Sequence, residues 1–214
     1  MSRRVGVLGG TFDPIHLGHL DVAAAAHAAL ALDRVLLVPS RQPPHRAAAQ
    51  ASPFHRFAMT ALAAATQPYL EASDLELQSA SGPSYTIDTL RRLHGAGFTP
   101  IELFFIIGSD AFAEIETWKA YPQLFEAAHF LVISRPGQPA EAMRARVPAL
   151  ASHMREAAAG IADRLPSIVL IEAPTCDVSS TTIREIRQRG GSIAGLVAAP
   201  VDAHIQRHRL YRDH

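Results

Sequence analysis

Short apolar runs alternate with amphipathic segments along the whole chain. Each run is four or five residues long and contains no polar position, as in strands that are buried on both faces. These runs are Val5–Leu8, Val35–Val38, Leu103–Ile107, Phe130–Ile133 and Ile168–Ile171. Because strands and helical segments alternate throughout, the pattern predicts an α/β protein with a doubly wound, mostly parallel sheet.

The segments between these strands predict helices, and in the first of them apolar residues recur at i, i+3, i+4 and i+7. Ser52-Pro53 is a good N-cap and first-turn pair, and Gly95 and Gly190 follow two of the helical segments as stop signals. The expected helices are 18–30, 53–65, 85–93, 179–190 and 201–211, with shorter pieces at 112–115 and 123–127. We further expect a strand over 69–77 and helix over 138–164, interrupted by Pro148.

Composition restricts the classes of protein to which the chain can belong. With 214 residues it suits a single domain, 1–214, whose C-terminal helical segment from about 179 to 214 packs on the rest. Twenty basic and twenty acidic residues give a net charge of zero, so we expect no nucleic-acid or membrane partner. The single cysteine indicates a reducing compartment, and no apolar stretch reaches the length of about 20 residues that spans a membrane. We therefore expect a soluble cytoplasmic protein, of an oligomeric state that the sequence does not indicate.

The stretch after the first strand has the features of a phosphate site. Gly9 and Gly10 allow backbone to approach a ligand, and His16 and His19 follow on either side of Gly18, where a helix begins. A helix N-terminus attracts anions, and imidazoles add further donors. The histidine pair is also compatible with half of a zinc site, but the chain offers no second cysteine and no nearby acidic ligand, so we expect no metal there. The Walker A loop and the G-x-G-x-x-G fingerprint are both missing.

A second candidate phosphate site begins at Ser179. Ser179, Ser180 and Thr181 start a helix, and Arg184 lies one turn further along it. Hydroxyl groups and free backbone amides at the positive end of a helix dipole bind phosphate well. The alternative is an ordinary N-cap followed by a solvated basic face.

Other candidate ligand-binding residues also follow predicted strands, where ligands bind in open α/β sheets. Asp110 could accept from ribose hydroxyls or simply cap a helix. Arg135 could contact a phosphate or nucleobase, or form a surface ion pair. His45 and Arg46 add two potential cations in the loop after the second strand.

The run from Gly9 to His19, GGTFDPIHLGH, resembles the H-x-G-H signature of the nucleotidylyltransferase superfamily. The resemblance implies a Rossmann-like nucleotidylyltransferase fold that transfers a nucleotidyl group from ATP or CTP and releases pyrophosphate. Val178 to Arg184 is similar to the I-S-S-T-x-I-R motif of that family, with Val178 in place of isoleucine. Arg46 stands where the family usually has lysine. By resemblance the ATP-binding residues are Gly9, Gly10, Thr11, Phe12, Gly18, Asp110, Arg135, Ser179, Ser180, Thr181 and Arg184.

Two further stretches, Ser84–Thr89 and Gly108–Tyr121, resemble nicotinate mononucleotide adenylyltransferases of the bacterial type, and the similarity extends over nearly the whole chain. It implies transfer of AMP from ATP to nicotinate mononucleotide in NAD biosynthesis, with Mg²⁺ accompanying ATP. The implied catalytic residues are His16, His19 and Arg46. The implied acceptor-binding residues are His45, Tyr85, Thr86, Trp118 and Lys119, although Trp118 could also be a core residue. The alternatives are transfer of an adenylyl or cytidylyl group to another acceptor, such as pantetheine phosphate, or a non-catalytic nucleotide-binding protein.

Overall fold

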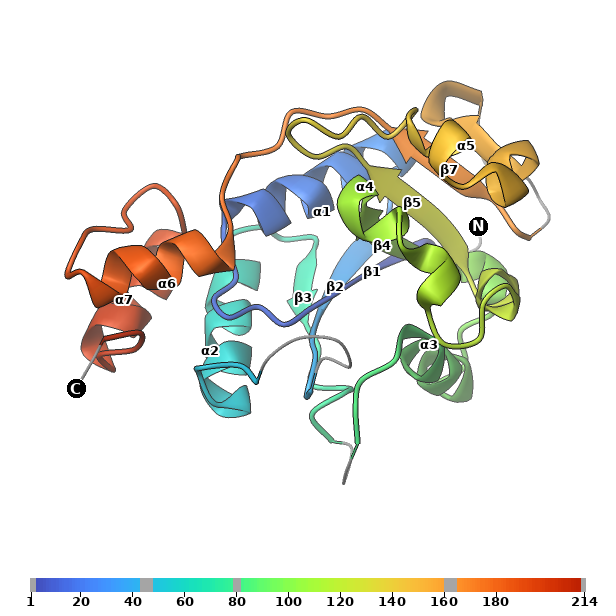
Figure 1. Ribbon diagram of the computed structural model, residues 1–214. Helices are drawn as coiled ribbons and strands as arrows, with labels where there is room; N and C mark the ends of the chain where they lie inside the picture. The colour runs from blue at the N-terminus through green and yellow to red at the C-terminus, as the bar shows by residue number, and fades with distance from the viewer. Residues whose placement is uncertain (1–2, 43–47, 79–81, 160–164, 213–214) are drawn as a thin grey trace. The chain divides into compact units, whose positions relative to one another are not determined.

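The computed structural model describes residues 3–42, 48–78, 82–159 and 165–212. Seven strands among these residues form one sheet in the order β3-β2-β1-β4-β5-β7-β6 (Figure 1). The pairs β1–β4, β4–β5, β5–β7 and β6–β7 are parallel. The strands are β1 (Val5–Gly10), β2 (Arg34–Pro39), β3 (Leu70–Ala72), β4 (Leu103–Gly108), β5 (His129–Ile133), β6 (Met154–Glu156) and β7 (Ile168–Ile171). The predicted α/β fold with a mostly parallel sheet is confirmed.

Helices connect the strands along the chain. The α-helices are α1 (Leu17–Leu30), α2 (Pro53–Ala64), α3 (Thr86–Gly95), α4 (Ser109–Phe112), α5 (Met143–Arg146), α6 (Ser180–Gln188) and α7 (Ala199–Arg207). Short 3-10 helices are Pro100–Glu102, Ile115–Thr117, Gln123–Glu126, Pro148–His153 and Ala157–Ala159. Within the part of the chain that the structure describes, no helix is both long enough and apolar enough to cross a membrane.

The chain divides into two compact units, each made of separate stretches of sequence. Unit 1 comprises Met1–Leu8, Asp21–Val35 and Tyr85–Thr175, and unit 2 comprises Gly9–Leu20, Leu36–Ser84 and Cys176–His214. The organisation of 1–214 as a single domain stays a prediction.

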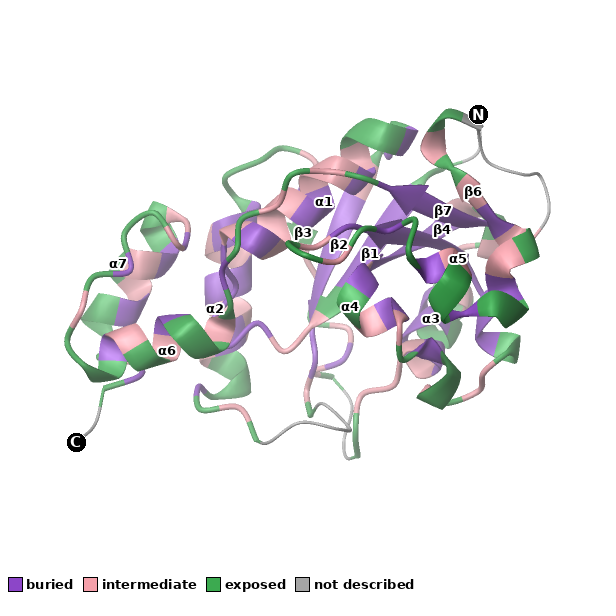
Figure 2. Cartoon of the chain, turned by 45° about the horizontal axis from the view of Figure 1, so that its top comes forward, coloured by how far each residue is buried: buried purple, intermediate pink, exposed green. Residues whose placement is uncertain are grey.

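The core of unit 1 is formed by strands whose side chains are buried on both faces. In β4 and β5 the registered pairs include Phe105 with Phe130 and Ile106 with Leu131, and each of these four side chains is at most 5% exposed. Figure 2 shows β4 in the purple of buried residues. This burial explains why both strands are continuous apolar runs rather than alternating patterns.

Unit 2 contains α2, which packs against α7 (Figure 1). The Ser52 side chain caps α2 by accepting a hydrogen bond from the backbone N–H of His55, and Pro53 occupies the first turn. The buried face of α7 consists of Val201 and Ile205. The C-terminal helix α7 is therefore packed on α2 within unit 2.

The strand expected over 69–77 is wrong beyond its first residues. Strand β3 ends at Ala72, and the following residues form a turn in which the backbone N–H groups of Leu77 and Gln78 donate to the Asp74 carbonyl. Serine and aspartate favour such turns because their short side chains bond to nearby backbone, as the Ser73 hydroxyl does to the Leu75 N–H.

The helix expected over 138–164 is also wrong. The structure has one α-helical turn at Met143–Arg146, a 3-10 helix from Pro148, and the short strand β6, which pairs with β7. Pro148 has no N–H to continue the helix, and pairing with a buried neighbouring strand decides the conformation of Met154–Glu156. Residues 160–164 lie outside the described residues.

Candidate active site

The loop after β1 is arranged around the ring of Phe12. A Cβ atom on Gly10 would lie 2.6 Å from Cε1 of Phe12, so only glycine fits there. Phe12 has a positive φ of 49° and is 1% exposed, and its ring packs edge-on against the ring of His19, with centroids 5.0 Å apart. The side chain of Phe12 therefore orients His19 instead of facing a ligand, and only its backbone could contact ATP.

The two histidines of the motif form a stacked pair at the start of α1. Their ring centroids are 3.7 Å apart, and the backbone N–H of His16 donates to Nδ1 of His19 at 3.3 Å. Since Nδ1 accepts this bond, the neutral ring of His19 carries its proton on Nε2.

His16 and His19 differ in how far a ligand can reach them. His19 is partly exposed, whereas His16 is only 3% exposed. A ligand can therefore reach the ring of His19 but not that of His16 in this conformation, and contact of either imidazole with a phosphate stays a prediction. His16 stacks against it, and Gly18 is buried in the first turn of α1.

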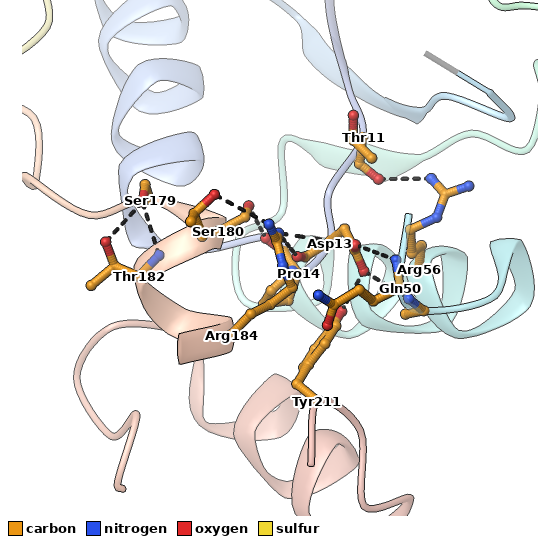
Figure 3. Close-up of polar contacts among 12 residues, drawn as sticks. Thr11, Asp13, Pro14, Gln50, Arg56, Ser179, Ser180, Thr182, Arg184 and Tyr211 are labelled. Atoms are coloured by element: carbon orange, nitrogen blue, oxygen red, sulfur yellow. Dashed lines mark hydrogen bonds and ion pairs between the residues drawn. The ribbon is translucent and has the colours of Figure 1, made fainter. Parts of the chain in front are cut away.

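The N-terminus of α6 contacts the loop that precedes the histidines. The Ser180 hydroxyl donates to the Pro14 carbonyl at 2.9 Å, and Nη1 of Arg184 donates to the Asp13 carbonyl at 2.8 Å (Figure 3). Nη2 of Arg184 donates to the Thr181 hydroxyl at 3.1 Å. Within unit 2, the two predicted phosphate motifs are thus joined by direct hydrogen bonds.

Ser179 has the capping role that was the alternative to phosphate binding. Its hydroxyl accepts from the backbone N–H of Thr182 at 3.1 Å, and the side chain is exposed. The two roles are compatible, because a capped first turn still presents further backbone N–H groups and hydroxyls to an anion.

Three buried polar residues that no sequence motif indicated hold this region together: Asp13, Arg56 and Tyr211. Arg56 is 1% exposed and donates to the carbonyls of Thr11 (2.7 Å), Ser40 (2.6 Å) and Arg41 (3.1 Å). It therefore ties the loop after β1 to the loop after β2. Burial lowers the pKa of Arg56, and the charge of Asp13 partly offsets this effect. Arg56 lies on the buried face of α2 together with Met59 and Ala63. The helical spacing of these three residues is visible in the sequence and could have indicated that Arg56 is buried.

In unit 1, Asp110 and Arg135 lie beside the same glycine at the end of β4. A Cβ on Gly108 would collide with a carboxylate oxygen of Asp110 and would lie 3.3 Å from Cγ of Arg135. Asp110 is exposed and Arg135 is partly exposed. The structure therefore brings these two predicted ATP-binding residues together, and it requires a residue without a side chain between them.

The predicted acceptor-binding residues of unit 1 also come together. Nζ of Lys119 is 2.7 Å from a carboxylate oxygen of Asp88 and lies over the ring of Tyr85, 4.3 Å from its centroid. Thr86 begins α3 next to Tyr85. Trp118 packs edge-on against Phe105 and is partly exposed, so it is not a fully buried core residue.

The remaining predicted site residues, His45 and Arg46, lie outside the described residues. Among the residues that are described, no group of His, Cys, Asp or Glu side chains could hold a metal ion.

Comparison with known proteins supports the resemblance. A family model described as cytidylyltransferase-like matches residues 7–186. The chain is 41% identical to a probable nicotinate-nucleotide adenylyltransferase from Desulfatibacillum aliphaticivorans, over 97% of this chain and 99% of the relative. It is also 41% identical to proteins of that name from Roseiflexus sp. (99% and 99%) and Thermus thermophilus (98% and 100%).

The fold is shared with a solved structure, Plasmodium falciparum nicotinic acid mononucleotide adenylyltransferase complexed with NaAD. Its TM-score is 0.74 at 19% identity, over 98% of this chain and 97% of that one. At this identity the likeness establishes the fold alone. The near full-length identity of about 40% to curated relatives establishes the family: the chain belongs to the nicotinate-nucleotide adenylyltransferases, a family of nucleotidyltransferase enzymes, as its motifs predicted.

Proposed function

We propose that this chain transfers AMP from ATP to nicotinate mononucleotide, giving nicotinate adenine dinucleotide and pyrophosphate in NAD biosynthesis. Family membership supports the reaction, and one observation in unit 2 carries the assignment of the site. The N-terminus of α6 is hydrogen-bonded to Asp13 and Pro14, three and two residues before His16. Donors from both motifs can therefore reach one polyphosphate.

His19 is the residue that we assign to the transferring phosphate. Its Nδ1 accepts from the His16 backbone N–H, so its Nε2–H is a donor of fixed orientation. The edge of Phe12 and the stacked ring of His16 limit rotation of the imidazole. A pre-oriented donor of this kind stabilises charge that develops in a transition state. We assign His16 to the same step as the support of His19, since direct contact with a phosphate would require its ring to become exposed.

Ser179, Ser180, Thr181 and Arg184 are assigned to the β- and γ-phosphates of ATP. Ser180 and Arg184 bond to backbone carbonyls, which are neutral acceptors. A phosphate oxygen is charged and accepts a stronger hydrogen bond, particularly from a guanidinium group. The guanidinium of Arg184 has N–H donors besides the one that bonds the Asp13 carbonyl, and the first turn of α6 adds backbone N–H groups. These donors can bind phosphate oxygens while the bonds to the two carbonyls keep the side chains in place.

The acceptor needs no general base in this reaction. A phosphate monoester has its second pKa near 6, so it is already an anionic nucleophile at neutral pH. The barrier comes from repulsion between two polyanions and from the in-line geometry, so catalysis consists of positioning and of neutralising charge. By family resemblance we assign Arg46 and His45 to nearby phosphates.

The residues that we assign to the nucleoside and to the pyridine ring of the acceptor belong to unit 1. We assign Asp110 and Arg135 to ATP by resemblance, and their common contact with Gly108 supports a shared ligand. For the pyridine ring we assign Trp118, Tyr85 and Thr86. Lys119 is paired with Asp88, which agrees with recognition of the pyridine carboxylate by hydroxyl and backbone N–H donors instead of by a dedicated cation.

The described residues do not form a Mg²⁺ site of their own, which supports entry of the cation together with the substrate. The described residues offer no cluster of metal ligands, and the carboxylate of Asp13 is filled by hydrogen bonds from Gln50, Ala51 and Tyr211. A resident protein cage for Mg²⁺ therefore does not fit these residues. We propose that the ion is part of the Mg–ATP substrate, since Mg²⁺ commonly binds through substrate phosphates.

Release of pyrophosphate from Mg–ATP tests this proposal, with nicotinate mononucleotide, its amide counterpart and pantetheine phosphate offered as acceptors in parallel. We expect the highest kcat/KM with the acid mononucleotide. Release of pyrophosphate with pantetheine phosphate but with neither mononucleotide would show that the chain uses another acceptor. ATP binding without pyrophosphate release would indicate a non-catalytic nucleotide-binding protein.

His19→Ala tests the catalytic assignment within the same assay. We expect kcat to fall by roughly 10²–10³, the usual loss of one transition-state donor. His27→Ala is the matched control, because His27 lies in the last turn of the same helix, where alanine is well tolerated. Wild-type turnover by the His19 variant would refute the role of this imidazole.

A further inference from the structure

The carboxylate of Asp13 is a buried hub in the loop between β1 and α1. Asp13 is 4% exposed, and its Oδ1 accepts from the Ala51 N–H at 3.0 Å and from the Tyr211 hydroxyl at 2.8 Å. Its Oδ2 accepts from the Gln50 N–H at 2.8 Å and lies 4.0 Å from Nη1 of Arg184 (Figure 3). Three hydrogen bonds and a nearby guanidinium compensate the cost of burying this charge, and they fix the orientation of the carboxylate.

The backbone carbonyls of Asp13 and of the adjacent Pro14 bind two side chains of α6. The carbonyl of Asp13 accepts from Arg184, and the carbonyl of Pro14 accepts from Ser180. Side chain and main chain of Asp13 are linked through one Cα atom. The donors that fix the Asp13 carboxylate therefore also help to fix the carbonyls to which Arg184 and Ser180 bond.

Tyr211 reaches this hub from the far end of the chain. It follows α7, is 7% exposed, and has a positive φ of 60°, an uncommon backbone conformation for a tyrosine. Burial raises the pKa of its phenol well above the ordinary value, and the adjacent Asp13 adds to this effect. The hydroxyl is thus a permanent neutral donor, held in place despite an unfavourable backbone angle.

We propose that Tyr211 and Asp13 are positioning residues for the triphosphate donors on α6. The Tyr211 hydroxyl fixes the Asp13 carboxylate, and the carbonyls of Asp13 and the adjacent Pro14 in turn align Arg184 and Ser180 for the β- and γ-phosphates of ATP. Neither residue touches the reacting atoms. This inference rests on the proposed function, because it presumes that α6 binds the triphosphate.

Tyr211→Phe removes only the hydroxyl group and keeps the buried ring. We expect about tenfold weaker ATP binding by isothermal titration and a similar rise in KM for ATP, since a small misplacement of binding groups reduces affinity and rate. The KM for the acceptor should be unchanged, because the residues assigned to its pyridine ring, Tyr85, Thr86 and Trp118, belong to unit 1, whereas Asp13 and Tyr211 belong to unit 2. Tyr69→Phe is the matched control, as it removes a hydroxyl from a half-buried tyrosine of unit 2 outside the proposed site.

A double-mutant cycle tests whether the hydroxyl acts through Asp13. Asp13→Asn replaces one acceptor oxygen with an amide donor, and this should also weaken ATP binding. If both residues act in one chain of contacts, Tyr211→Phe should add little to the loss in the Asp13→Asn background. Additive losses would overturn the proposed coupling.

Two other results would overturn the inference. One is wild-type ATP affinity in Tyr211→Phe. The other is an equal loss of affinity for ATP and for the acceptor in Tyr211→Phe that matches the loss of folded protein measured by urea unfolding. This result would mean that the hydroxyl only stabilises the fold. Failure of the proposed function is distinguishable, because the wild-type protein would then bind ATP without releasing pyrophosphate, and the comparison of ATP affinities would still be valid.

Discussion

Protonation of His129 should destabilise the protein as the pH falls below neutrality. His129 begins β5, is 2% exposed, and its ring stacks on that of Phe104 with centroids 5.0 Å apart. Burial lowers the pKa of His129 to about 4, and the charge of Arg155 contributes in the same direction. The folded protein therefore holds this imidazole in its neutral form over a wide pH range.

The magnitude follows from the difference between the folded and unfolded pKa values. The unfolded value is 6.5 and the folded value about 4. At about 1.4 kcal/mol per pKa unit, this difference corresponds to about 3 kcal/mol. Because the folded pKa is the lower one, the unfolded chain binds more protons between pH 6.5 and 4. The contribution of His129 to the free energy of unfolding is therefore fully present above about pH 6.5, and it is lost progressively as the pH falls towards 4.

Urea unfolding followed by circular dichroism at pH 7, 6, 5 and 4 measures the effect. His129→Phe keeps an aromatic ring against Phe104 and removes the titrating group, so its curve of unfolding free energy against pH should be flatter by about 3 kcal/mol over this range. His153→Phe, at a partly exposed position, should retain the wild-type slope. If the free energy of unfolding of wild type and of His129→Phe depended on pH in the same way, His129 would not be the source of the predicted loss of stability.

Substitutions at three further positions test the packing and capping described above, each by urea unfolding. Arg56→Met leaves three backbone carbonyls without their donor and should cost about 3–5 kcal/mol, and Arg56→Lys should recover only part of this loss. Gly6→Ala places a methyl group 2.9 Å from Cδ1 of Leu32 and 3.0 Å from Cδ1 of Ile106, and should cost about 1–3 kcal/mol; an unchanged midpoint would show that these side chains yield easily. Ser52→Ala removes the cap of α2 and should cost about 1 kcal/mol, whereas equal stability would mean that Pro53 alone sets the helix start.

The sequence by itself determined the buried strands and the location of both predicted phosphate motifs. A strand such as Leu103–Gly108 is buried on both faces, so its apolar run is a local signal that needs no knowledge of its neighbours. The glycine bend and the hydroxyl residues at Ser179 are likewise local, because backbone freedom and helix capping depend on a few adjacent residues.

Only the tertiary structure decided which side chains support those motifs. Asp13 and Tyr211 are 198 positions apart, and their hydrogen bond cannot be inferred from any local pattern. Met154–Glu156 is a strand because it pairs with β7, although the surrounding sequence predicts helix. Burial of His16 behind His19 is also a tertiary outcome, since the spacing of two histidines does not say which ring faces solvent. Local sequence sets what a segment can do, and packing against distant segments determines which of those possibilities has the lowest free energy.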